Sequence, residues 1–193
     1  MNTNPITGFV LAGGQSRRMG IDKSLMSLNG KTLIEYSIDA LRPLCNSIII
    51  SSNNSIYDFT GCEVWPDELQ VQAPIVGIYS CLKRSKTDIN IILSCDMPLI
   101  STTIIEYLLE NSVNHHITVP VHQNGFIEPL CGIYKQSAIA ILKEFIDKRN
   151  FRLNDCILVS SHCLVPAYQL SFFSPNTFIN INTHEDFNGL QSL

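Results

Sequence analysis

Apolar residues follow two patterns along the chain. Continuous apolar runs such as Ile48-Ile49-Ile50 predict strands that are buried on both faces of a sheet. Apolar residues at helical spacing, as in residues 31–44, predict helices with one buried face. The predicted strands cover residues 9–11, 48–50, 64–65, 89–93, 117–121 and 126–134, and the predicted helices cover residues 31–44, 74–82, 103–109 and 137–148.

The order of these elements predicts the architecture. A strand, a helix and a second strand joined by a long crossover form a parallel pair with a right-handed connection. Repetition of this unit gives a three-layer α/β domain with a mostly parallel central sheet. No internal repeat, low-complexity tract or linker interrupts residues 1–193, so we expect a single domain.

Short polar signals mark the ends of several elements. Asn29-Gly30 and Asn124-Gly125 predict tight turns. Thr103 followed by Glu106 predicts a capping box at the start of a helix, and Pro120 places its strand at a sheet edge or near its own end. Weaker signals predict a strand over residues 156–166, a short strand or loop over residues 178–182, and a terminal turn capped by Thr183 and Asp186.

The composition excludes several classes of protein. The net charge is −4 and charged residues make up 16% of the chain, whereas an electrostatic nucleic-acid binder needs a basic stripe. No apolar run approaches the roughly 18 residues of a membrane span, and the N-terminus lacks the pattern of a signal peptide. The 7 cysteines are scattered, as is typical of reduced thiols. We therefore expect a cytoplasmic protein that binds neither nucleic acid nor membrane.

A glycine-rich basic segment follows the first predicted strand directly. Gly13-Gly14 allows a sharp turn and a close approach of the backbone to a ligand, and exposed amides in such a turn bind anions. Arg17, Arg18 and Lys23 add positive charge beside these amides. The segment indicates a phosphate loop, with an ordinary glycine-rich turn and solvated basic residues as the alternative.

The spacing of this segment excludes two common phosphate loops. Neither the Gly-x-x-x-x-Gly-Lys-Ser/Thr of a P-loop nor the Gly-x-Gly-x-x-Gly of a dinucleotide site occurs here. Leu11 to Lys23 instead fill the signature Leu-Ala-Gly-Gly-x-Ser-x-Arg-Met-Gly-x-Asp-Lys, so the chain resembles the nucleotidyltransferases. The Asp22-Lys23 ending resembles the molybdenum cofactor guanylyltransferases, since cytidylyltransferases more often carry Pro-Lys. This resemblance implies a Rossmann-like nucleotidyltransferase fold.

Asp96 follows an apolar strand and precedes Met97-Pro98. Ligands of parallel sheets bind at the carboxyl ends of the strands, where residues 11–23, residues 51–54 and Asp96 all fall. A carboxylate at this edge either holds Mg²⁺ against phosphate oxygens or caps the next turn. Asp96-Met97-Pro98 resembles the family's Asp-Met-Pro motif, whose Asp binds the metal. The resemblance therefore implies Mg²⁺ as cofactor and Asp96 as its ligand.

Other segments resemble the family's binding motifs. Asn53 and Asp67 match its nucleotide-binding Asn and Asp, and a carboxylate such as Asp67 can accept from both N1–H and the amino group of guanine. Ala73 replaces the first glycine of a Gly-Pro-Leu-x-Gly motif, and His184 replaces a proline near the C-terminus. The resemblance implies a nucleotide site of Leu11, Ala12, Gly13, Gly14, Lys23, Asn53, Asp67 and Asp96, and an acceptor site of Pro129, Leu130, Gly132, Tyr134, Asn180 and Asn182.

The resemblance also implies a reaction. GMP would pass from GTP to the terminal phosphate of molybdenum-molybdopterin, giving molybdopterin guanine dinucleotide and pyrophosphate. Arg18, Lys23 and Asp96 are the expected catalytic residues, because such a transfer depends on positioning and charge neutralisation. Molybdenum-insertion or apoenzyme-delivery proteins are expected as transient partners. Two alternatives stay open: a related cytidylyl- or sugar-phosphate nucleotidyltransferase, and a non-catalytic nucleotide-binding module.

Overall fold

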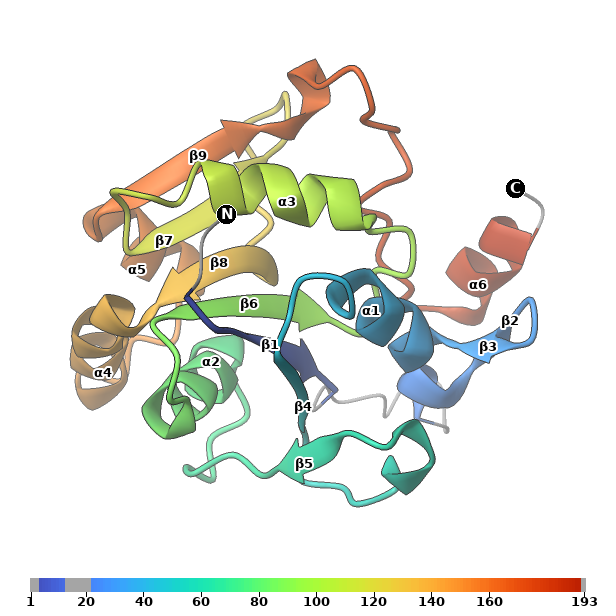
Figure 1. The fold of residues 1–193 in the computed structure, drawn as a ribbon, viewed down its shortest axis with the longest axis horizontal. Helices are drawn as coiled ribbons and strands as arrows, with labels where there is room; N and C mark the ends of the chain where they lie inside the picture. The colour runs from blue at the N-terminus through green and yellow to red at the C-terminus, as the bar shows by residue number, and fades with distance from the viewer. Residues whose placement is uncertain (1–3, 13–21, 192–193) are drawn as a thin grey trace.

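A central sheet carries helices on both faces. The computed structural model describes residues 4–12 and 22–191. Within these residues seven strands form one sheet in the order β5-β4-β1-β6-β8-β7-β9, and β8 alone runs against the others (Figure 1). The strands are β1 (Ile6–Leu11), β4 (Ser47–Ser51), β5 (Glu63–Trp65), β6 (Ile89–Ser94), β7 (Ile117–Val121), β8 (Cys131–Lys135) and β9 (His162–Pro166).

The helices form the two outer layers. One face of the sheet is covered by α1 (Leu33–Leu41) and α3 (Thr102–Glu110), and the other by α2 (Pro74–Arg84), α4 (Ile139–Asp147) and α5 (Leu153–Val159). The predicted three-layer fold with a mostly parallel sheet is therefore confirmed. No helix among the described residues is both long and apolar enough to span a bilayer.

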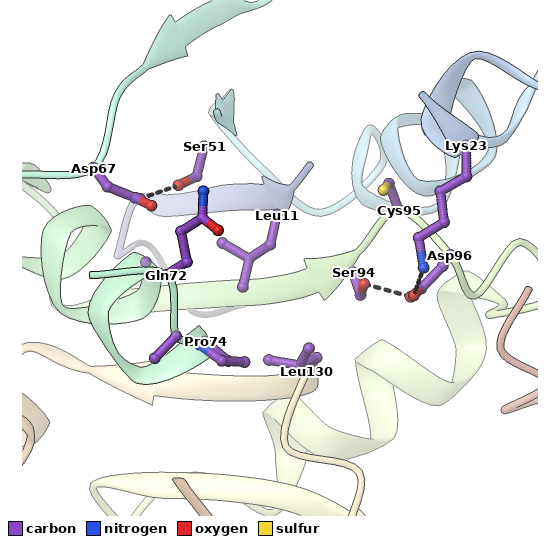
Figure 2. Close-up of a pocket in the computed structure, with 12 residues that line it drawn as sticks. Leu11, Lys23, Ser51, Asp67, Gln72, Pro74, Ser94, Cys95, Asp96 and Leu130 are labelled. Carbon is purple, nitrogen blue, oxygen red and sulfur yellow. Dashed lines mark hydrogen bonds and ion pairs between the residues drawn. The ribbon is translucent and has the colours of Figure 1, made fainter. Parts of the chain in front are cut away.

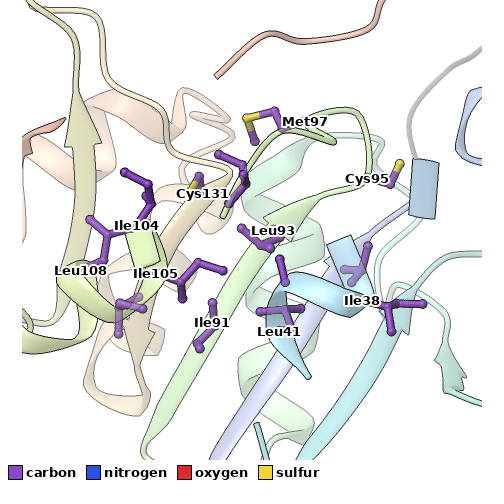
Figure 3. Packing of buried hydrophobic residues seen from close by; sticks show 14 of the residues in the cluster. Ile38, Leu41, Ile91, Leu93, Cys95, Met97, Ile104, Ile105, Leu108 and Cys131 are labelled. Carbon is purple, nitrogen blue, oxygen red and sulfur yellow. The ribbon is translucent and has the colours of Figure 1, made fainter. Parts of the chain in front are cut away.

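Side chains alternate across each strand and so enter two separate cores. Val10, Ile91 and Leu93 pack against α1 and α3, whereas Phe9 and Ile92 pack on the side of α2. Because both faces of β1 and β6 are buried, Phe9–Leu11 and Ile91–Leu93 are continuously apolar. Figure 3 shows the first core, to which α1 contributes Ile38 and Leu41 and α3 contributes Ile104, Ile105 and Leu108.

A smaller core joins the C-terminal helix α6 (His184–Gln191) to a hairpin of β2 (Ser27–Leu28) and β3 (Lys31–Thr32). Asn29 and Gly30 both have positive φ and form its turn, as predicted. The predicted cap at Thr183 and Asp186 is also confirmed, since each side chain accepts from backbone N–H groups at the start of α6. The core residues are Met26, Leu28, Leu33, Ile181, Phe187 and Leu190.

Two predicted starts are wrong. Helix α3 is capped by Ser101, whose Oγ accepts from Ile104 N at 3.4 Å, whereas Thr103 lies inside the helix and caps nothing. The strand predicted over residues 126–134 begins only at Cys131. Pro129 has no N–H to donate to a strand ladder. Residues 129–130 form a turn, and residues 126–128 before it are irregular apart from one isolated bridge between Ile127 and Val121.

The prediction for residues 156–166 is wrong in its first half. Leu153, Cys156 and Ile157 are buried at helical spacing and belong to α5, so the strand starts only at His162. Pro120 lies near the end of β7, which is an internal strand because β9 pairs with it; the edge position is wrong. Residues 178–182 form a loop, the second of the two predicted alternatives.

Candidate active site

An open cavity of about 270 Å³ lies at the carboxyl ends of β1, β4 and β6. Figure 2 shows it between two carboxylates, with Asp67 at one end and Asp96 at the other. This is the edge of a parallel sheet at which ligands bind. The cavity is lined by Leu11, Lys23, Ser51, Asp67, Gln72, Ala73, Pro74, Gly77, Ser94, Cys95, Asp96 and Leu130.

The Asp96 end contains an ion pair. Lys23 Nζ lies 2.5 Å from Asp96 Oδ2 and also donates to Asn182 Oδ1 at 3.2 Å and Ile181 O at 3.3 Å. The Lys23 and Asp96 side chains are only 16% and 14% exposed, so water screens their charges incompletely. Three oxygens from two distant segments of the chain therefore converge on one cation.

The end of β6 fixes the Asp96 carboxylate. Ser94, the last residue of the strand, donates its hydroxyl hydrogen to Asp96 Oδ1, while Lys23 lies on Oδ2 (Figure 2). The Asp96 carbonyl accepts from Ile181 N at 2.9 Å, which ties the loop before α6 to the same edge of the sheet. Both oxygens of this carboxylate are thus oriented by neighbours before any ligand arrives.

The Asp67 end carries a second carboxylate. Asp67 Oδ1 accepts from Ser51 Oγ at 3.2 Å, and the Asp67 N–H donates to Asn53 Oδ1 at 3.0 Å. No ion pair within residues 4–12 and 22–191 includes Asp67. Burial raises the pKa of Asp67 above its ordinary value, and the hydrogen bond from Ser51 offsets part of that effect. This end therefore suits neutral N–H donors of a ligand.

Gly77 of α2 leaves space beside Asp67. A Cβ at this position would lie 3.6 Å from Asp67 Oδ1 and 3.9 Å from both Leu11 Cδ2 and Ser51 Oγ. These are ordinary van der Waals distances, so packing does not require a glycine here. The missing side chain enlarges the cavity instead, and the glycine is therefore more readily explained by a ligand than by the fold.

The predicted nucleotide residues fall into three groups. Leu11, Lys23, Asp67 and Asp96 line the cavity itself. Ala12 and Asn53 adjoin it: Ala12 N donates to the Ser51 carbonyl at 3.0 Å, and Asn53 supports the backbone of Asp67. Gly13, Gly14 and Arg18 lie outside the described residues, as does Arg17.

Two of the predicted acceptor residues lie at the cavity or its ion pair. Leu130 is a lining residue, and Asn182 contacts Lys23 through its side-chain oxygen. The Asn180 side chain turns to the backbone of the same loop, where its Nδ2 donates to Phe178 O at 3.2 Å. The two asparagines therefore do not share one environment, although they alternate along the loop.

The other three predicted acceptor residues lie within or beside the sheet. Tyr134 is fully buried and donates its hydroxyl hydrogen to Pro129 O at 2.7 Å, which braces the turn before β8. A Cβ on Gly132 would lie 2.6 Å from Val119 Cγ1 and 2.8 Å from Thr118 O. The glycine at 132 is thus required by the packing of β7 against β8, in contrast to Gly77.

The sequence assigns no role to several side chains that support the site. Ser51 and Ser94 each end a strand and hold one of the two carboxylates; their only sequence signal is that position. His122, for which the sequence gives no role, pairs with the buried Glu128 at 2.9 Å between Nε2 and Oε1. Burial raises the pKa of the Glu128 carboxyl.

The oxygens around Lys23 have the chemistry that Mg²⁺ prefers. Asp96 supplies a carboxylate, Asn182 an amide oxygen and Ile181 a carbonyl, all hard donors. The described residues contain no cluster of three or more Asp, Glu, His or Cys side chains that could hold a metal by themselves. A site with one carboxylate fits a magnesium ion that is shared with substrate phosphates.

Comparison with known proteins supplies independent evidence. Residues 8–157 match the family model described as the MobA-like NTP transferase domain. The chain is 36% identical over 186 residues to a probable molybdenum cofactor guanylyltransferase of Pyrococcus horikoshii, covering 92% of this chain and 94% of that protein. It is 31% identical over 185 residues to a protein of the same name from Flavobacterium johnsoniae, with 96% of both chains covered.

A solved structure shares the fold. The crystal structure of molybdopterin-guanine dinucleotide biosynthesis protein A from Archaeoglobus fulgidus matches with a TM-score of 0.81. The match covers 96% of this chain and 97% of that one at 23% sequence identity. At this level of identity the likeness establishes the arrangement of strands and helices alone.

Proposed function

The chain belongs to the MobA-like NTP transferase family of nucleotidyltransferases, and we propose that it transfers GMP from GTP to the terminal phosphate of molybdenum-molybdopterin. The products are molybdopterin guanine dinucleotide and pyrophosphate. The observation that carries this proposal is one cavity with two different carboxylates: Asp67, which has no ion pair among the described residues, and Asp96, which is paired to Lys23. The relatives named molybdenum cofactor guanylyltransferase support the choice of acceptor.

Asp67 recognises the guanine base in this proposal. Guanine presents two adjacent N–H donors, N1–H and the 2-amino group, whereas cytosine and adenine present one donor beside an acceptor. A carboxylate accepts both hydrogens of guanine and repels the lone pair of the other bases. Ser51 and Asn53 hold Asp67 in place for this contact, and Gly77 leaves room for the ring.

The transfer itself needs no protein base. The acceptor phosphate is largely ionised at neutral pH, since its second pKa is about 6. One of its oxygens forms a bond to the α-phosphorus of GTP. At the same time, the bond between that phosphorus and the oxygen that bridges the α- and β-phosphates breaks. Pyrophosphate leaves with the electron pair. Lys23 offsets the charge at the α-phosphate, and Arg18 with the amides of Gly13 and Gly14 is proposed to hold the leaving group.

Asp96 and Asn182 would hold the magnesium ion, supported by the Ile181 carbonyl, when the Lys23 ammonium leaves these oxygens for the α-phosphate. When bound, Mg²⁺ supplies positive charge to phosphate oxygens. Ser94 keeps the Asp96 carboxylate oriented for this task. Pro129, Leu130, Gly132, Tyr134 and Asn180 form or support the acceptor side in our proposal, and proteins that insert molybdenum or receive the cofactor are its proposed transient partners.

A thermal-shift screen with GTP, CTP, ATP and UTP, each with and without Mg²⁺, tests the nucleotide. A ligand at 100 times its dissociation constant stabilises the folded state by about 2.7 kcal/mol. We expect GTP with Mg²⁺ to raise the melting temperature most, and Asp67→Asn to remove that preference. A larger shift with CTP would favour a cytidylyltransferase, and no shift with any nucleotide would contradict the proposal.

A further inference from the structure

We propose that Tyr57 is a positioning residue for Lys23. Its buried hydroxyl contacts the chain at Ala12, directly before Gly13-Gly14, and at Asp22, directly before Lys23. Through Asp22 it fixes the short helix η2 (Lys23–Leu25), from which Lys23 reaches Asp96. The inference rests on the proposed transfer reaction, in which Lys23 is catalytic.

The contacts of Tyr57 define a closed hydrogen-bond network. Its hydroxyl lies 3.0 Å from Asp22 Oδ2, 3.0 Å from Ser24 Oγ and 3.3 Å from Ala12 O. Asp22 Oδ1 in turn accepts from Ser24 N at 3.1 Å and from Ser24 Oγ at 2.6 Å. Every oxygen of the Asp22 side chain is therefore engaged at the start of η2.

This network explains the acidic residue of the Asp22-Lys23 pair. Asp22 caps η2 and receives the tyrosine hydroxyl, so its carboxylate serves the architecture of the turn. It is not among the residues that line the cavity. The lysine that follows, in contrast, projects into the cavity and contacts Asp96. Asp22 therefore has a structural role, and the adjacent Lys23 has the proposed catalytic role.

Burial makes the network stiff. Tyr57 and Ser24 are both 0% exposed, so water cannot replace a lost hydrogen bond without opening the core. Burial also raises the pKa of the Tyr57 phenol to about 12, so the hydroxyl keeps its hydrogen at physiological pH. A rigid anchor matters for Lys23, because displacing a group by about 1 Å can cost roughly a hundredfold in rate.

Tyr57 acts from outside the cavity. It caps the short helix η3 (Asp58–Thr60), far along the chain from both ends of the network, and it does not line the cavity. A loss of its hydroxyl should therefore lower the rate of transfer without weakening the base contact at Asp67. This separation distinguishes a positioning residue from one that binds nucleotide.

The test is Tyr57→Phe, with Tyr36→Phe as matched control. Tyr36 is a partly buried tyrosine that also donates to a backbone carbonyl, Leu28 O at 3.0 Å. We expect Tyr57→Phe to lower kcat for pyrophosphate release by roughly 10- to 100-fold and to change KM for GTP by less than about 3-fold. Tyr36→Phe should leave kcat unchanged. An unchanged kcat in Tyr57→Phe would overturn the inference.

A double-mutant cycle tests whether Tyr57 acts through Asp22. In an Asp22→Asn background, Tyr57→Phe should reduce kcat by less than about 3-fold further, because residues of one network are not additive. Equal losses in both backgrounds would contradict the linkage. If Tyr57→Phe does not fold, Asp22→Asn alone carries the test. It replaces one of the two acceptor oxygens by an N–H₂ donor, so that Ser24 and Tyr57 can no longer both donate to the side chain. A normal kcat would then overturn the inference. Inactive wild-type protein would instead contradict the proposed reaction.

Discussion

The two ends of the cavity hold the same functional group, a carboxyl, in different electrostatic surroundings. Asp96 pairs with Lys23 at 2.5 Å, whereas Asp67 has a serine hydroxyl and a raised pKa. A carboxylate beside a cation favours further charged ligands, such as a metal and phosphate oxygens. A partly desolvated carboxylate without a cation favours neutral donors that satisfy its lone pairs. The difference assigns phosphate chemistry to one end and base recognition to the other.

The same contrast extends to the supporting residues. At the Asp96 end, the contacts come from segments far apart in sequence, with Lys23 and Asn182 separated by 159 positions. At the Asp67 end they come from adjacent parallel strands, β4 and β5, whose pairing brings Ser51 next to Trp65. The phosphate end therefore depends on the whole fold, whereas the base end depends on one strand pair and the start of α2.

The largest expected effect is at the phosphate end. Asp96→Ala and Lys23→Ala should each lower the transfer rate by roughly a hundredfold to a thousandfold, because each removes a charge that acts on the reacting phosphates. Circular dichroism and the melting curve should stay close to those of the wild type. Asp96→Asn serves as the isosteric control and should be nearly as impaired as Asp96→Ala. Normal turnover in Asp96→Ala or Lys23→Ala would contradict the assignment of phosphate chemistry to the Asp96 end.

At the base end we expect a change of specificity instead. Asp67→Asn replaces one acceptor oxygen by an N–H₂ donor, which opposes the donors of guanine. The preference for GTP over CTP should fall by on the order of 10- to 100-fold, measured as the ratio of kcat/KM values. The rate with saturating GTP should fall less than in Asp96→Ala. An unaltered GTP-to-CTP ratio would show that the base is read elsewhere.

Gly77→Ala should separate stability from binding. Alanine is favoured over glycine in a helix by about 1 kcal/mol, and the added Cβ meets only ordinary contacts. We expect the melting temperature to rise by about 2–4 °C while the affinity for GTP falls by roughly tenfold, measured by calorimetry. Gly132→Ala is the control for steric strain: its Cβ would collide with Thr118 O, so we expect destabilisation by about 1–3 kcal/mol. Unchanged GTP affinity in Gly77→Ala would mean that the base does not bind beside Gly77.

The smallest expected effect is a pH dependence. Because the pKa of Asp67 is raised in the folded protein, the folded state binds more protons than the unfolded state just above pH 3.8, and stability falls as pH rises through that window. Asp67→Asn lacks this loss. The melting temperature of Asp67→Asn minus that of the wild type should therefore increase between pH 4 and neutral pH, by a few degrees at most. A constant difference would mean that burial does not penalise the ionised carboxylate.

Sequence predicts the site best where a residue follows a buried strand. The runs before Leu11 and Asp96 are apolar because both faces of β1 and β6 are covered. The positions of these two residues at the sheet edge can therefore be predicted from the sequence. The type of fold follows from the same runs. Short elements are harder to predict: α5 ends in the continuous apolar run Cys156–Val159, which also fits a strand.

Contacts that depend on strand register or on long-range packing cannot be predicted from one sequence. The Ser51–Asp67 hydrogen bond depends on how β4 pairs with β5, and the Lys23–Asn182 contact depends on the small core under α6. The Tyr57–Asp22 bond links residues 35 positions apart through an otherwise ordinary loop. No local pattern marks these partners, since each side chain is compatible with a solvated turn.

The transfer reaction itself gives the most direct test of the central claim. Purified protein would be incubated with GTP, Mg²⁺ and molybdenum-molybdopterin, and both pyrophosphate and the dinucleotide product would be quantified, the latter by mass spectrometry. We predict one pyrophosphate for each molybdopterin guanine dinucleotide. Pyrophosphate release should be much slower when GTP is replaced by CTP, and roughly a hundredfold to a thousandfold slower when Asp96→Ala replaces the wild type. GTP binding without dinucleotide formation, or equal product formation from CTP, would contradict this account.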